Sequence, residues 1–259
     1  MYRTAIEDLH KWKNKENKKP LIIRGARQVG KTWLMKEFGN IAYAETAYIN
    51  FENNPQMKDL FAADMKIDRI ITGIEIYNGR KIDPKNTLLI FDEIQEVPAA
   101  LTSLKYFNEN APQYQIVCAG SLLGVALHPG TSFPVGKVEF LDLYPLSLTE
   151  FMLAMQKGRF ADLLKNGDLE MATTFKQEYV NLLKHYYYVG GMPEAVQDFA
   201  ENCDFNSVRD IQQRILTAYE QDFSKHAPSE EVPRIRMLWN SIPSQLTKEN
   251  KKFIYGLIK

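Results

Sequence analysis

Residues 25–32 read Gly-Ala-Arg-Gln-Val-Gly-Lys-Thr, a glycine-rich pattern that constrains the fold more than any other part of the chain. Its two glycines allow the backbone to curl, so that successive N–H groups point into one concavity. A short apolar run, 19–24, precedes the pattern, and a helical stretch, 32–38, follows it. Strand, glycine-rich turn and helix in this order predict a phosphate-binding loop at a helix N-terminus, where the helix dipole favours anions.

Each fixed position of this loop has a predicted role in holding a nucleoside triphosphate. Lys31 can reach the β- and γ-phosphates, and the hydroxyl of Thr32 can ligate Mg2+. We expect the nucleotide contacts to come from Gly25, Ala26, Arg27, Gln28, Val29, Gly30, Lys31, Thr32 and Trp33. The alternative is a glycine-rich turn with an incidental lysine, and the strand and helix on either side argue against it.

Four apolar residues followed by two acids, 88–93, form a second part of the same predicted site. In a phosphate-loop fold this is the Walker B position, at the carboxyl end of a strand beside the loop, where ligands of open α/β sheets bind. Asp92 would hold Mg2+, usually through its water shell, and Glu93 would orient and polarise the attacking water. The alternative is a helix that begins with acids, which is also favourable.

Ser121 follows the next predicted strand, 115–119, and is a third catalytic candidate. A polar group at that edge could sense the γ-phosphate or position the water, and the alternative is a simple turn or N-cap serine. No arginine stands out as a finger that would stabilise the transition state. The arginines of the helical C-terminal part are more typical of surface salt bridges, and another subunit could supply the charge: Arg209, Arg214, Arg234 and Arg236.

Composition excludes several other classes of protein. Lysine plus arginine equals aspartate plus glutamate, at 32 each, so no global charge favours nucleic acid or an anionic membrane. Because neither a signal peptide nor an apolar run of membrane length is present, we expect a cytoplasmic protein without a membrane partner. The two cysteines, Cys118 and Cys203, lie far apart and give little support to a disulfide or a cysteine metal site.

Strands and helices alternate over the first 145 residues. Apolar strand candidates at 19–24, 47–52, 87–91, 115–119 and 138–143 are separated by helical segments, which predicts an α/β fold with a parallel sheet flanked by helices. From a capping box at 147–150 onwards the helical period dominates. We therefore predict a core at 1–145, a helical subdomain at 146–200 and a helical segment at 201–259, with two helices around Pro243 in its last part.

These segments resemble the prokaryotic AAA+/STAND-like predicted ATPases, in which a P-loop ATPase core precedes a poorly characterised C-terminal domain. The resemblance is carried, in the family's order, by residues 24–32, 91–95, 119–124, 145–151 and 188–195. It implies ATP as the nucleotide, places Ser121 at the position called sensor 1, and makes 146–200 a lid. It also implies that Pro193, in the run Gly-Met-Pro, packs near the adenine; the alternative is a helix-breaking turn.

The end of the chain resembles the opening of a winged-helix-like module. Residues 241–246 and the lysines at 248, 251 and 252 carry this likeness. Because the family usually continues well past this point, we expect a recognition helix or wing to be missing after Lys259. DNA is therefore a candidate partner only through this module, and three lysines on a helix are also typical of a solvated face.

Three classes of function are compatible with these residues. The leading hypothesis is a Mg2+-dependent ATPase that acts as a nucleotide-driven switch on an unidentified protein partner, with a homo-oligomer as a candidate assembly. A small-molecule or nucleotide kinase is disfavoured because Glu93 suits water activation, and a GTPase because no Asn-Lys-x-Asp follows the strands. The third hypothesis is a nucleotide-gated scaffold or DNA-associated regulator with negligible turnover, which the missing arginine finger would fit.

Overall fold

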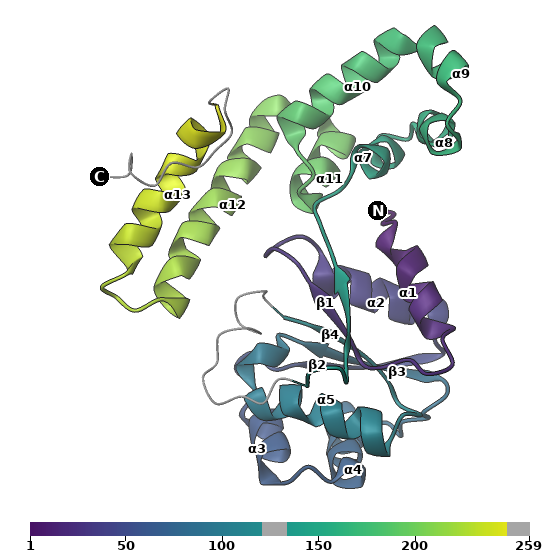
Figure 1. The fold of residues 1–259 in the computed structure, drawn as a ribbon, viewed down its shortest axis with the longest axis vertical. Helices are drawn as coiled ribbons and strands as arrows, with labels where there is room; N and C mark the ends of the chain where they lie inside the picture. Colours follow the sequence, from purple (N-terminus) through teal and green to yellow (C-terminus); the bar gives the residue numbers. More distant parts are fainter. Residues whose placement is uncertain (121–133, 248–259) are drawn as a thin grey trace. The chain divides into compact units, whose positions relative to one another are not determined.

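The computed structural model describes residues 1–120 and 134–247, and the chain divides into two compact units (Figure 1). The first unit comprises Met1–Phe205 and the second comprises Asn206–Lys259. All of the predicted nucleotide-binding residues lie in the first unit, which contains both the sheet and the helices that follow it. None of the described helices is long and apolar enough to cross a membrane.

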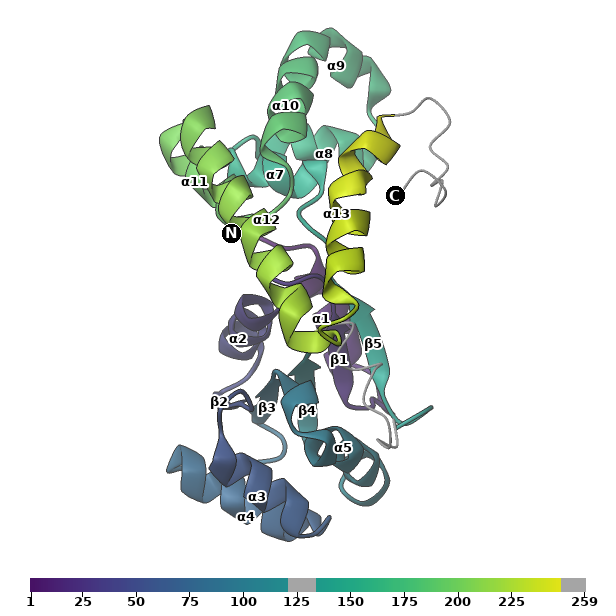
Figure 2. The same ribbon diagram turned by 90° about the vertical axis from the view of Figure 1, so that its left-hand side faces the viewer.

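A five-stranded parallel sheet forms the centre of the first unit, and Figure 2 shows its strands side by side. The strands run in the order β2-β3-β4-β1-β5 and are β1 (Leu21–Arg24), β2 (Glu45–Asn50), β3 (Thr87–Asp92), β4 (Gln115–Ala119) and β5 (Glu139–Asp142). The carboxyl ends of parallel strands meet at one edge, where β1 leads into the glycine-rich loop. The predicted parallel sheet flanked by helices is confirmed.

Helices cover both faces of this sheet (Figure 1). One face packs against α1 (Ala5–Lys13) and α2 (Lys31–Ala42), and the other against α3 (Pro55–Ala63), α4 (Ile67–Asn78) and α5 (Pro98–Asn110). Side chains alternate along a strand, so neighbouring residues face opposite sides of the sheet. Ile22 and Leu89 pack on the side of α3, α4 and α5, whereas Ile23 and Ile90 pack on the side of α1 and α2. Covering on both faces explains why β3 and β4 are buried along their length and apolar apart from their end residues.

Five helices follow the sheet within the first unit: α7 (Leu148–Ala154), α8 (Gly158–Asn166), α9 (Leu169–Thr174), α10 (Lys176–Val189) and α11 (Pro193–Asn202). The predicted capping box begins α7, since Ser147 Oγ accepts from the Glu150 N–H and the Glu150 carboxylate accepts from the Ser147 N–H. Gly167 and Gly190 end α8 and α10 at positive φ, a conformation that glycine adopts without strain. These helices make up the helical region that follows the sheet in the first unit.

The second unit contains most of α12 (Phe205–His226) and the helix α13 (Val232–Leu246). Their facing aromatic rings, Tyr219 and Trp239, stack with centroids 5.9 Å apart. The predicted helix break at Pro243 is wrong, because α13 continues through that residue. Pro243 cannot donate to the carbonyl four residues before it, but the helix continues past it and its own carbonyl accepts from Thr247 N at 3.2 Å. The second helix predicted after it extends into residues outside the described range.

Candidate functional site

The glycine-rich loop connects β1 to α2 at the carboxyl edge of the sheet. Gly30 precedes the helix at a φ of 95°, which a residue with a Cβ adopts only with strain. At Gly25 the reason is space, since a Cβ there would lie 2.3 Å from the carbonyl oxygen of Leu143. The two glycines of the pattern are therefore required for different reasons, one for conformation and one for close backbone approach.

Lys31 is buried in the first turn of α2, and its ammonium group folds back onto the loop. Its Nζ donates to the carbonyl oxygens of Gly25 at 3.0 Å and Ala26 at 2.9 Å. Burial lowers the pKa of Lys31, and the carboxylates of Glu93 and Asp92 oppose that change. The positive charge is thus held at the loop, where a phosphate group would require it.

Asp92 ends β3 with its side chain buried and hydrogen-bonded on both oxygens. Thr32 Oγ1 donates to Asp92 Oδ2 at 2.7 Å, and the backbone N–H of Glu93 donates to Oδ1 at 3.1 Å. In the sheet β4 lies between β1 and β3, so the aspartate strand is not the direct neighbour of the loop strand. The contact still forms, since the first turn of α2 presents Thr32 to the aspartate.

Tyr48 is a member of this site that sequence reasoning missed. Its hydroxyl donates to the same Asp92 Oδ2 at 3.0 Å, and it lies on β2, paired in register with Ile90 of β3. Burial, followed by the charge of Asp92, raises the pKa of Tyr48, so that the hydroxyl keeps its proton and remains a donor. The sequence feature that could have identified it is a tyrosine on the strand next to the aspartate strand.

Glu93 begins a short 3-10 helix, η1 (Ile94–Glu96), in a left-handed backbone conformation with a φ of 51°. Its carboxylate accepts a hydrogen bond of 2.6 Å from Gln95 Nε2, and Gln95 is only 3% exposed. Gln95 was also missed as a site residue, although it lies three positions after the predicted Mg2+ ligand. The strained turn and the buried amide together fix the direction of the Glu93 carboxylate.

The remaining predicted residues differ in how they relate to the loop. Ser121 lies outside the described residues. Pro193 is the first residue of α11, and its Cγ lies 3.6 Å from the position that a Cβ on Gly30 would occupy. Within the loop itself Val29 is buried, and Trp33 on α2 is 40% exposed. The fold therefore brings Pro193 to the same loop as Lys31, although the two residues are 162 positions apart in the sequence.

Solved structures similar to this chain at low sequence identity include an ATPase and a DNA-bound complex. The Walker-type ATPase PABY2304 of Pyrococcus abyssi matches with 14% identity and a TM-score of 0.49, over 93% of this chain and 77% of its own. The Drosophila ORC bound to DNA matches with 16% identity and a TM-score of 0.45, over 97% and 69% of the two chains. No curated protein sequence matches the chain.

Two family models match the sequence. The model described as an AAA domain matches residues 17–152, a range that includes the glycine-rich loop, Asp92, Glu93 and the first turn of α7. The model described as a domain of unknown function (DUF8612) matches residues 180–259. The AAA-domain match covers more than half of the chain and every part of the site described above except Pro193.

Proposed function

This chain belongs to the AAA-domain family, and we propose that it binds ATP with Mg2+ and hydrolyses it at the site formed by residues 25–32, Asp92 and Glu93. The observation that carries the proposal is the hydrogen bond of 2.7 Å between Thr32 Oγ1 and Asp92 Oδ2. A hydroxyl and a carboxylate are the hard oxygen ligands that Mg2+ prefers, directly or through water. Their meeting beside the buried ammonium of Lys31 supports a site for a metal-bound triphosphate.

The residues have distinct proposed roles in the reaction. Lys31 and the loop N–H groups bind the phosphates, and Thr32 and Asp92 hold Mg2+, which neutralises charge developing on the phosphate oxygens. Glu93 accepts a hydrogen bond from the attacking water and directs it at the γ-phosphate. Gln95 sets the direction of the Glu93 carboxylate, as its bond of 2.6 Å supports.

We also propose that the chain uses ATP as a switch. In this reading 1–145 is the ATPase core, 146–200 is a lid, and 201–259 is a C-terminal module. The position of Pro193 next to Gly30 supports a lid that responds to the nucleotide, with Pro193 near the adenine. The switch would act on an unidentified protein partner in the cytoplasm, with DNA and a second copy of the chain as further candidates.

A phosphate-release assay tests this function. Purified wild-type protein with Mg2+ and ATP, with and without DNA, should release phosphate faster than Lys31→Ala, which lacks the ammonium group of the loop. Lys11→Ala is the matched control, because it removes an exposed lysine that pairs with Asp8 on the same helix, α1. Equal release by the wild type and Lys31→Ala would contradict hydrolysis at this site.

A thermal-shift measurement with Mg2+ and ATP separates binding from turnover. The melting temperature of the wild type should rise, and that of Lys31→Ala should rise much less. A shift in the wild type without phosphate release would favour the nucleotide-gated regulator over the ATPase.

A further inference from the structure

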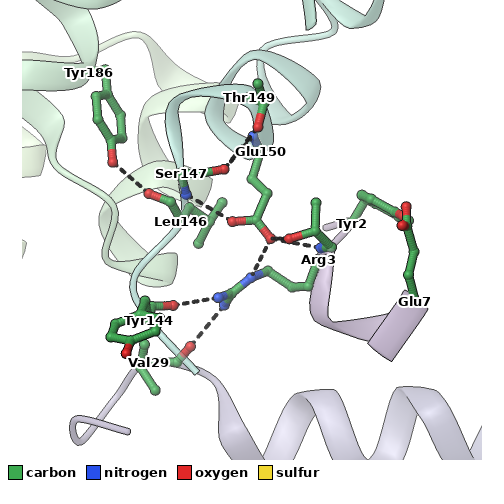
Figure 3. Close-up of polar contacts among 11 residues, drawn as sticks. Tyr2, Arg3, Glu7, Val29, Tyr144, Leu146, Ser147, Thr149, Glu150 and Tyr186 are labelled. Carbon is green, nitrogen blue, oxygen red and sulfur yellow. Dashed lines mark hydrogen bonds and ion pairs between the residues drawn. The ribbon is translucent and has the colours of Figure 1, made fainter. Parts of the chain in front are cut away.

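Arg3 lies buried against the glycine-rich loop, although no part of the loop pattern involves it. Its guanidinium donates three hydrogen bonds, and Figure 3 shows that they diverge to three segments. Nη1 donates to the carbonyl of Val29 at 2.9 Å, Nη2 to the carbonyl of Tyr144 at 2.6 Å, and Nε to Glu150 Oε1 at 3.2 Å. One side chain therefore joins the loop, the end of the sheet domain and the start of α7.

Glu150, the partner of Arg3, is itself fully engaged. Its Oε1 accepts from the backbone N–H of Thr4 at 2.7 Å and from the Thr4 hydroxyl at 3.0 Å. Its Oε2 accepts from the Ser147 N–H at 2.8 Å, as Figure 3 shows. The side chains of Arg3 and Glu150 are each 4% exposed. A buried ion pair is tolerated only when its remaining polar atoms are satisfied, and this one meets that condition.

The bond from Arg3 to Val29 controls an atom that a phosphate would contact. In a trans peptide the carbonyl and the following N–H point in opposite directions, so fixing the Val29 carbonyl also fixes the Gly30 N–H. The N–H groups of such a loop are its phosphate ligands. A Cβ on Gly30 would lie 3.6 Å from Arg3 Nη1 and 3.6 Å from Pro193 Cγ, which places the guanidinium and the lid residue at the same peptide.

We propose that Arg3 is a positioning residue for the phosphate loop, held in place by Glu150, so that the N-terminal segment and the first turn of α7 form part of the nucleotide site. Arg3 does not touch the nucleotide in this proposal. It acts by orienting the peptide between Val29 and Gly30, and Glu150 couples that orientation to the lid. The inference rests on the proposed function, because it presupposes that the loop binds phosphates.

The test compares nucleotide affinity in Arg3→Met and the wild type by isothermal titration with ATP and with ADP. Loss of one charge-assisted contact to the loop should raise both dissociation constants by about tenfold, and by the same factor, because the loop cradles phosphates that both nucleotides carry. The matched control is Arg24→Met, since Arg24 forms a bidentate pair of 2.8 Å with Asp142 directly before the loop. Arg24→Met should leave both constants unchanged.

Arg3→Lys distinguishes positioning from a merely structural role, and it decides the question if Arg3→Met does not fold. A lysine keeps the charge that Glu150 needs but does not span three divergent acceptors. We expect a melting temperature close to wild type together with weaker binding of both nucleotides. A folded Arg3 variant with wild-type dissociation constants would overturn the inference alone, whereas a wild type that binds neither nucleotide would overturn the proposed function and the inference together.

Discussion

Thr32 and Asp92, which are separated by 60 positions in the sequence, are joined by a hydrogen bond of 2.7 Å between Oγ1 and Oδ2. The strands that lead to them are not neighbours in the sheet, because β4 lies between β1 and β3. A third element contributes to the same carboxylate oxygen, which also accepts from the hydroxyl of Tyr48 on β2. The proposed metal ligand is thus oriented by side chains from two other elements, α2 and β2.

Tyr48→Phe tests whether this orientation matters for Mg2+. Loss of a hydrogen bond to a metal-binding carboxylate commonly weakens metal affinity by about tenfold or more. We expect the Mg2+ concentration for half-maximal phosphate release to rise by a similar factor. Tyr43→Phe is the control, because Tyr43 donates an equivalent bond of 2.8 Å to Gln115 away from the loop. An equal Mg2+ requirement in all three proteins would remove Tyr48 from the site.

Glu93→Gln should separate ATP binding from hydrolysis. An amide keeps the size of the side chain but is a poor acceptor for the proton of the attacking water, so turnover should fall by about 100-fold or more while ATP affinity stays near wild type. Single-turnover phosphate release and a binding titration measure the two quantities.

Glu96→Gln provides the matched control for that substitution. Glu96 is the exposed acid at the end of the same 3-10 helix and contacts Gln95 Nε2 at 3.5 Å, much longer than the 2.6 Å bond to Glu93, so its loss should leave both quantities close to wild type. Turnover by Glu93→Gln at the rate of Glu96→Gln would show that another group orients the water.

The sequence predicted those parts of the site whose pattern is local. Short motifs predict Lys31, Thr32 and Asp92. Each of these residues lies at the end of a strand or the start of a helix, so its position follows from the local secondary structure alone. Tyr48 and Gln95 contribute side-chain contacts that no spacing rule specifies, so they had to be found from coordinates. Contacts of this kind depend on rotamers and on the packing of neighbouring elements.

Glu150 illustrates the same limit within one residue. Its local role in the capping box was predictable from the run 147–150 and is confirmed. Its bonds to Arg3 and Thr4 join positions 147 and 146 residues apart, and only the assembled fold brings them together. At Pro243 the local signal was misleading, because a proline predicted a helix break and α13 continues through that residue.

The buried carboxylate of Glu150 should give the protein an acid-sensitive stability. Burial alone raises the pKa of Glu150, but the N–H groups of Ser147 and Thr4 and the charge of Arg3 outweigh it and lower that pKa below its usual value. A group with a lowered pKa contributes stability above its unfolded pKa, about 4.3, and loses that contribution as pH falls through the folded value. Wild-type stability should therefore decline below about pH 4.3.

Urea unfolding of Glu150→Gln between pH 7 and pH 3 measures this contribution. At pH 7 the variant should be less stable by about 3 kcal/mol, because Arg3 is left buried without its counter-charge. Below pH 4.3 the difference from wild type should shrink. Glu16→Gln, which removes an exposed glutamate, controls for the change in net charge. A constant difference at every pH would contradict the role of the ionised carboxylate.

Gly191 allows two backbone segments of the helical region after the sheet to touch. Its carbonyl accepts from Leu146 N at 2.6 Å, and a Cβ at this position would lie 2.3 Å from the Leu146 carbonyl oxygen, which also accepts from Tyr186. Gly191→Ala should therefore lower the free energy of unfolding by about 1–3 kcal/mol, the usual cost of forcing an extra carbon into a packed site. Urea denaturation measures this loss.

The same substitution should also weaken nucleotide binding, because Gly191 lies two positions before Pro193 and a shift of the backbone there moves Pro193 away from Gly30. Gly158→Ala is the control: a Cβ there meets nothing closer than 3.6 Å, and the residue is helical without a positive φ. Gly158→Ala should keep wild-type stability and affinity. A Gly191→Ala variant that loses stability but binds ATP with wild-type affinity would show that the lid packs on the core without acting on the nucleotide.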